Sequence, residues 1–181
     1  MFPLNLPNVL TVIRILLVPV LVVVLLVNTK NGSWVAAGVF ALAACTDGLD
    51  GYIARSRQSI TTFGKVMDPV ADKLLIVAAL ISLVSLDRVA AWVAMVIIAR
   101  EFAVSGLRIA AGQQGVVIPA SALGKIKTIV QVAAVFVLIA VDDTSQAWVQ
   151  VLVYAAVVVT VVSGIDYFLN VRRRIEEART V

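Results

Sequence analysis

The chain contains no histidine, a single cysteine and few charged residues, and each scarcity removes a class of chemistry. Without histidine the protein has neither an imidazole base nor an imidazole metal ligand. Cys45 alone cannot form an intrachain disulfide, and the small residues around it predict a packing role. Any proton transfer must therefore fall to a carboxylate, a lysine or a tyrosine.

Charge is scarce because the chain is mostly hydrocarbon. Of its 181 residues 61% are hydrophobic and 14% charged, and the mean hydropathy is +1.03. A soluble domain is about 45–50% apolar and about 25% charged. Apolar runs of about 20 residues favour membrane-spanning helices over barrel strands. We predict an all-α integral membrane protein that forms one domain over residues 1–181.

The hydrophobic runs predict six transmembrane helices with short connections. Their expected bounds are Leu6–Val27, Trp34–Ala54, Val66–Leu86, Val89–Ala110, Leu123–Val141 and Ala147–Leu169. The first run lacks a basic leading segment and a small-residue cleavage site, so we expect no removable signal peptide.

Basic residues divide unequally between the two faces of the predicted membrane protein. Of the 15 Lys and Arg residues, all but Lys30 and Arg88 fall near span ends on one face. The positive-inside rule makes that face, with both termini, cytoplasmic. Because these residues lie at helix ends without a soluble domain, we expect no nucleic-acid partner.

Four carboxylates recur at helical spacing between the second and third spans. Asp47 and Asp50 lie three residues apart, and Asp68 and Asp72 lie four apart. Each spacing places a pair on one face of a helix, the second pair about 6 Å apart along the axis. Two such pairs facing each other would repel unless protons or cations offset their charge. Hard divalent cations take carboxylate oxygens, so this stretch is the candidate metal and active site.

The surroundings of the acids strengthen that interpretation. Gly51 and Gly64 stand at the two corners of a polar segment, Arg55–Phe63, predicted to be a loop. Glycine lets a ligand or a helix approach the backbone closely. The structural alternative is ion pairing of single acids at the interface, which explains four acids around one loop less well.

These residues resemble the signature of the CDP-alcohol phosphotransferase family. The matching pattern is Asp47-x-x-Asp50-Gly51-x-x-Ala54-Arg55, eight residues, then Gly64-x-x-x-Asp68-x-x-x-Asp72. The segment Pro7-Asn8-x-Leu10-Thr11-x-x-Arg14 resembles the opening of the same family. Further segments resemble its bacterial phosphatidylglycerophosphate synthase branch: Ala99-Arg100-Glu101-Phe102, Ser105-Gly106-Leu107-Arg108 and Gly124-Lys125-Ile126-Lys127-Thr128.

The resemblance implies a homodimeric six-helix enzyme of the bacterial cell membrane with a cytoplasm-facing site. Its reaction would transfer a phosphatidyl group from CDP-diacylglycerol to sn-glycerol 3-phosphate, releasing CMP. Two divalent cations, Mg²⁺ or Mn²⁺, would be held by Asp47, Asp50, Asp68 and Asp72, and Asp72 would also be the general base. The CDP pocket would be lined by Pro7, Asn8, Gly51, Arg55 and Thr61.

The acceptor phosphate needs cations on the cytoplasmic side. The candidates are Arg100, Arg108, Lys125 and Lys127. Alternatively, each of them snorkels to the membrane surface or complements the dipole at a helix end. Arg14 stays open between substrate binding and packing, and Glu101 between orienting Arg100 and simple pairing. Asp166 stays open between an ion pair and the site.

Two other functions remain in view. A related enzyme could use another acceptor, such as inositol phosphate or another alcohol; the basic residues favour a phosphorylated one. A divalent-cation transporter would need acids distributed through the membrane depth. All four acids lie toward one face, which disfavours transport.

Overall fold

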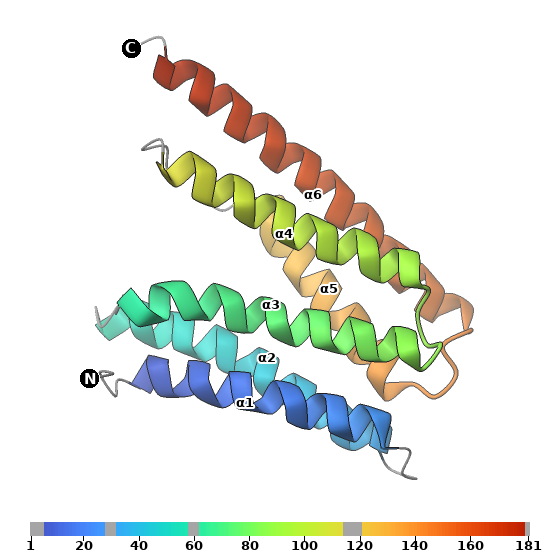
Figure 1. The fold of residues 1–181 in the computed structure, drawn as a ribbon. Helices are drawn as coiled ribbons and strands as arrows, with labels where there is room; N and C mark the ends of the chain where they lie inside the picture. The colour runs from blue at the N-terminus through green and yellow to red at the C-terminus, as the bar shows by residue number, and fades with distance from the viewer. Residues whose placement is uncertain (1–5, 28–31, 58–61, 114–120, 180–181) are drawn as a thin grey trace. The chain divides into compact units, whose positions relative to one another are not determined.

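The protein is all-helical in the part that the computed structural model describes, residues 6–27, 32–57, 62–113 and 121–179. Six helices follow one another along the chain (Figure 1). They are α1 Leu6–Leu26, α2 Gly32–Arg57, α3 Thr62–Ser85, α4 Ala91–Gln113, α5 Ala122–Ala140 and α6 Ala147–Arg179. The prediction of six helices is confirmed.

Several helix ends differ from the sequence prediction. α2 continues to Arg57 and α3 begins at Thr62, so both ends of the predicted loop Arg55–Phe63 are helical. Likewise, α6 runs beyond Leu169 to Arg179. Hydropathy marks the apolar part of a helix, whereas backbone hydrogen bonding continues into polar residues that tolerate a helix well.

The chain divides into two compact units. Unit 1 comprises Met1–Val89 and Val135–Thr144, and unit 2 comprises Ala90–Ala134 and Ser145–Val181. The prediction of a single domain over the whole chain stays a prediction.

Unit 1 is built from α1, α2, α3 and the last part of α5, with α1 packed against α2 and α3. Its core combines large aliphatic and aromatic side chains with alanine, which lets the helix axes approach closely. Fully buried members include Leu21, Ala36, Phe40, Ala71 and Leu83. Since only a few residues separate consecutive helices, neighbours run antiparallel. The start of α1, the end of α2 and the start of α3 therefore share one end of the unit (Figure 1).

Unit 2 contains α4, α6 and the first part of α5, with α4 packed along α6. A small hydrophobic cluster lies between α4 and α6. It consists of Val104, Ala111, Tyr167 and Val171, with Leu107 packed against it.

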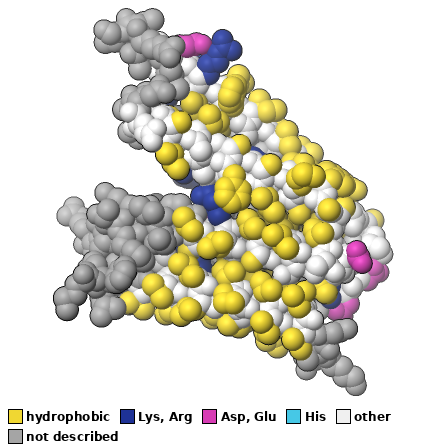
Figure 2. Space-filling view, viewed as in Figure 1, with side chains coloured by type: hydrophobic (Ala, Val, Ile, Leu, Met, Phe, Trp, Pro, Cys, Tyr) yellow, Lys and Arg dark blue, Asp and Glu magenta, His cyan; other side chains and the backbone are white. Residues whose placement is uncertain are grey.

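The described helices have the surface of a membrane protein. Three stretches are long and apolar enough to cross a bilayer: Val9–Leu26, Ala122–Ala140 and Ala147–Arg174. Hydrophobic side chains are spread over the described part of the face shown in Figure 2, and acidic ones appear only at its edges. The other three helices, α2, α3 and α4, carry most of the charged residues of the predicted site, which lowers their hydropathy. Six complete spans and the orientation of the termini stay predictions.

The packing role predicted for Cys45 was wrong within the described part of the chain. Its side chain is exposed, although Ala43 two residues earlier is fully buried. Two residues correspond to about 200° around a helix, so neighbours of similar size take opposite faces.

Candidate functional site

The four motif acids lie on two helices at one end of unit 1. The backbone is helical at Asp47 and Asp50 on α2, and at Asp68 and Asp72 on α3. At 1.5 Å per residue, Asp50 lies about 10 Å from the end of α2 and Asp68 about 9 Å from the start of α3. The two pairs therefore occupy similar depths on neighbouring helix ends. The side chains of Asp47, Asp50 and Asp68 lie outside the described residues.

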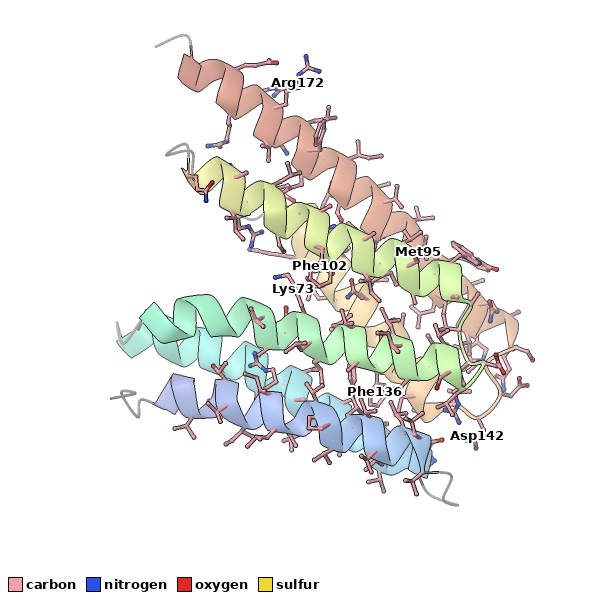
Figure 3. The ribbon with its side chains drawn as sticks, viewed as in Figure 1. Lys73, Met95, Phe102, Phe136, Asp142 and Arg172 are labelled. Atoms are coloured by element: carbon pink, nitrogen blue, oxygen red, sulfur yellow. The ribbon has the colours of Figure 1, made fainter. Side chains whose placement is uncertain are left out.

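Asp72 has a described side chain, and it lies at the edge of the core. The residue is half-buried and follows the fully buried Ala71, while Leu75 one turn later is also buried. Lys73 projects from the next position of α3 (Figure 3). A carboxylate at such an edge can keep one side toward the helix bundle and the other toward a polar site.

The predicted CDP pocket draws on the same end of unit 1. Pro7 and Asn8 lie in the first turn of α1, and Gly51 and Arg55 lie in the last turns of α2. Thr61 lies outside the described residues, as do the side chains of the other four. The backbone thus gathers four of the five predicted residues at the helix ends that carry the acids.

Arg14, whose role the sequence left open, is completely buried inside unit 1. Its side chain is 0% exposed, and so is Thr11 one turn earlier on α1. Arg14 lies about 12 Å along α1 from Leu6, a depth similar to that of the acid pairs. A buried guanidinium is costly unless acceptors surround it. Complete burial is compatible with both predicted roles, substrate binding and packing, so the role of Arg14 stays open.

Three of the charged residues predicted on α4 and α5 meet in unit 2. Glu101 Oε1 accepts a hydrogen bond from Lys127 Nζ and lies 3.5 Å from Arg100 Nη1. The second arm of Arg100 donates from Nη2 to Ser163 Oγ on α6 at 3.1 Å. The three charged side chains are each at most 14% exposed. This arrangement holds two cations against one carboxylate in largely dry surroundings.

Arg108 and Lys125 are placed differently. The Arg108 guanidinium lies over the Tyr167 ring, 5.7 Å from its centroid, in a cation–π arrangement. Lys125 is exposed while Lys127 is buried, because residues two apart on α5 point to different faces. The structure therefore joins Lys127 to Arg100 through Glu101, and it does not bring Lys125 into that group. The acceptor assignments of all four cations stay predictions.

Sequence reasoning missed the buried polar side chains of α6, of which Ser163 contacts Arg100. Thr160, Ser163 and Tyr167 recur at positions i, i+3 and i+7 and are all buried. Polar residues at helical spacing inside an apolar run are the signal that could have identified them. Asp166 points to a different partner, accepting a hydrogen bond from Asn170 Nδ2 at 3.2 Å.

Several buried polar atoms of unit 2 have no hydrogen-bond partner among the described residues. They are Arg100 Nε, Gln131 Oε1, Thr160 Oγ1 and the Tyr167 hydroxyl. Such atoms are rare in folded proteins and mark places where water or a ligand is bound. The interior of unit 2 therefore contains several buried polar groups in an otherwise apolar helical unit.

The donor set of unit 1 fits divalent cations. Four carboxylates on two neighbouring helix ends supply hard oxygen ligands of the kind that Mg²⁺ and Mn²⁺ take. Among the described side chains no group of three or more Asp, Glu, Cys or His could hold a metal. The side chains of Asp47, Asp50 and Asp68 are not among the described ones, so this finding does not include them.

The fold is that of an all-helical protein with long apolar helices, and it carries the acidic motif on the adjoining ends of α2 and α3. A family model described as CDP-alcohol phosphatidyltransferase matches residues 4–162. The chain therefore belongs to the CDP-alcohol phosphatidyltransferase family.

Individual relatives match over most of their length. A protein of Bacillus subtilis (strain 168) is 42% identical over 91% of this chain and 93% of its own. A Rickettsia felis protein is 39% identical over the same shares. Both are named CDP-diacylglycerol–glycerol-3-phosphate 3-phosphatidyltransferase. A Mycobacterium tuberculosis H37Rv protein named "Probable phosphatidylglycerophosphate synthase" is 42% identical over 94% of this chain and 83% of its own.

Proposed function

We propose that this chain transfers the phosphatidyl group of CDP-diacylglycerol to sn-glycerol 3-phosphate, giving phosphatidylglycerol phosphate and CMP. The observation that carries the proposal is the acidic motif on the adjoining ends of α2 and α3. It stands in a chain that matches relatives named for this reaction over nine-tenths of its length.

The reaction needs one proton transfer and one displacement at phosphorus. The free primary hydroxyl of glycerol 3-phosphate attacks the phosphorus that carries the diacylglycerol. A new P–O bond forms, the P–O bond to CMP breaks, and CMP leaves with the electron pair. Asp72 takes the hydroxyl proton as general base. The chain has no histidine to activate a serine or cysteine, which favours direct transfer over a covalent intermediate.

The acidic side chains also explain how the donor is held. Asp47, Asp50, Asp68 and Asp72 would hold two divalent cations, and the family is generally divalent-cation dependent. When bound, Mg²⁺ or Mn²⁺ would neutralise charge on the pyrophosphate and on the leaving oxygen. Pro7, Asn8, Gly51, Arg55 and Thr61 would surround the CDP group at the same helix ends.

The acceptor phosphate would be bound by the cations of unit 2. Arg100 and Lys127 are fixed on Glu101, and Arg108 is stacked on Tyr167 two turns further along α4. Arginine suits a phosphate because its planar fork donates two parallel hydrogen bonds. Lys125, exposed on α5, would act at longer range.

The cellular setting follows from the same residues. The excess of Lys and Arg near one set of helix ends supports a site that faces the cytoplasm of a bacterial cell. CDP-diacylglycerol would reach it from the bilayer and glycerol 3-phosphate from the aqueous side. The enzyme would work as a multi-pass homodimer of the cell membrane.

The test is release of CMP by the purified protein in detergent with CDP-diacylglycerol, Mg²⁺ and one acceptor at a time. Glycerol 3-phosphate should support release that EDTA abolishes and added Mg²⁺ restores. Release with inositol phosphate alone would keep the reaction type and reject the acceptor. No release with any acceptor, in protein with native helical circular dichroism, would reject the proposal.

Asp72→Asn tests the proposed base within the same assay. Turnover should fall by about 10²- to 10⁴-fold, the usual contribution of a general base. Asp166→Asn is the matched control, because Asp166 is also a half-buried helical carboxylate but bonds to Asn170. Near-normal turnover of Asp72→Asn would remove Asp72 as the base.

A further inference from the structure

A chain of polar contacts connects three helices of unit 2. It runs from Lys127 on α5 to Glu101 on α4, and through Arg100 to Ser163 on α6. Ser163 Oγ in turn donates to the carbonyl oxygen of Thr160 at 3.0 Å. Both arms of the Arg100 guanidinium are therefore held, one by a carboxylate and one by a hydroxyl that is itself oriented.

The packing around Arg100 reinforces this placement. A Cβ atom on Gly164 would lie 3.3 Å from Arg100 Cγ, closer than most carbon contacts allow. The glycine thus lets the stem of Arg100 lie directly against α6. Arg100 is held along its stem as well as at its head.

Glu101 is the member that both cations share. A single oxygen, Oε1, contacts Lys127 Nζ and Arg100 Nη1, and the Glu101 side chain is 13% exposed. Two cations close together in a medium of low dielectric repel each other strongly. A carboxylate between them offsets the repulsion and sets the spacing of the two positive groups.

We infer that Glu101 is a positioning residue for the acceptor, holding Lys127 and Arg100 at the spacing that receives its phosphate. This inference rests on the proposed function, since the phosphate is that of glycerol 3-phosphate. The Nε atom of Arg100, buried and without a partner among the described residues, leaves that guanidinium a donor beyond its two held arms.

The direction in which the KM for glycerol 3-phosphate changes distinguishes a positioning role of Glu101 from a purely electrostatic one. Removing a negative charge near a phosphate site should strengthen anion binding if charge alone matters. Removing the group that spaces the cations should weaken binding even though the net charge becomes more positive. Glu101→Gln keeps the shape of the side chain and removes its charge, so it distinguishes the positioning role from the charge effect.

The experiment measures kcat and both KM values by CMP release, starting with the wild-type protein. Glu101→Gln should raise the KM for glycerol 3-phosphate about 10-fold, the loss expected for one charge-assisted hydrogen bond. The KM for CDP-diacylglycerol and kcat should change by less than about 2-fold. Glu176→Gln, which breaks the exposed Arg172–Glu176 pair on α6, is the matched control and should match wild type.

A double variant shows whether Glu101 acts through Lys127. Lys127→Met alone should raise the acceptor KM, and adding Glu101→Gln should raise it no further, because residues in one network are not additive. Independent, additive effects would overturn the inference. So would an acceptor KM that is unchanged or lowered in Glu101→Gln, or a fall in kcat with both KM values altered alike.

Glu101→Asp keeps the proposal testable if Glu101→Gln does not fold. It retains the charge but sets the carboxylate back by one methylene, so it cannot bridge both cations equally well. The acceptor KM should rise several-fold with normal thermal stability, and a wild-type KM would overturn the inference. Failure of the proposed function is distinguishable, because wild-type protein would then release no CMP with glycerol 3-phosphate.

Discussion

Replacing Arg88, which lies outside the predicted active site, should strongly reduce the stability of the fold. Arg88 follows the C-terminus of α3, and its Nη1 donates to the carbonyl oxygens of Ile139 at 2.8 Å and Leu138 at 3.3 Å. These carbonyls belong to the last turn of α5, where backbone acceptors lack partners within the helix. Nη2 donates to Ser33 Oγ at 3.0 Å. One side chain therefore joins the start of α2, the end of α3 and the end of α5.

The magnitude follows from the individual contacts. A hydrogen bond to a charged donor contributes about 1.5–3 kcal/mol, and the cation at a helix C-terminus adds about 0.3–1 kcal/mol. The ion pair with Asp142 adds little, because its atoms are 3.8 Å apart and Asp142 is 89% exposed (Figure 3). Contacts made by one side chain are not additive, so Arg88→Met should lower the free energy of unfolding by about 2–4 kcal/mol, close to one charged hydrogen bond plus the helix-end contribution.

The assay is unfolding in mixed detergent micelles, followed by helical circular dichroism. Asp142→Asn serves as the control and should change the free energy by less than about 0.5 kcal/mol. Arg88→Lys should recover part of the loss, since it keeps the charge but cannot span several acceptors. A loss below about 0.5 kcal/mol for Arg88→Met, or a larger one for Asp142→Asn, would refute the reasoning.

Three further predictions concern other parts of the chain. Asp87 has φ 56° and occupies the left-handed position of a helix C-cap, with Arg88 N bonded to Leu83 O and Asp87 N to Val84 O. Asp87→Gly should stabilise by up to about 1 kcal/mol in micelle unfolding, and a loss of stability would contradict this. Phe40→Ala, at a fully buried core position, should cost about 3–5 kcal/mol in the same assay, and a loss below about 1 would reject its core role. Arg108→Ala should raise the KM for glycerol 3-phosphate more than that for CDP-diacylglycerol, whereas equal effects would argue against contact with the phosphate.

The six helices and the acidic motif can both be predicted from the amino-acid sequence alone. Long apolar runs without room for soluble loops allow only helices in a bilayer, because every backbone polar group must be satisfied internally. Helical spacing alone places Asp47 with Asp50, and Asp68 with Asp72, on shared helix faces. The ends of α2, α3 and α6 escaped prediction because hydropathy reports apolar length and not hydrogen bonding.

The contacts between helices were decided only by tertiary structure. The sequence grouped Lys125 with Lys127, but the rotation of α5 about its axis buries one and exposes the other. It left Glu101 beside Arg100, but the bridge to Lys127 requires α4 and α5 to be packed at one specific rotation. The complete burial of Arg14 also depends on helix packing. Helix geometry sets the direction of its side chain, but the neighbouring helices decide whether that direction is buried or exposed.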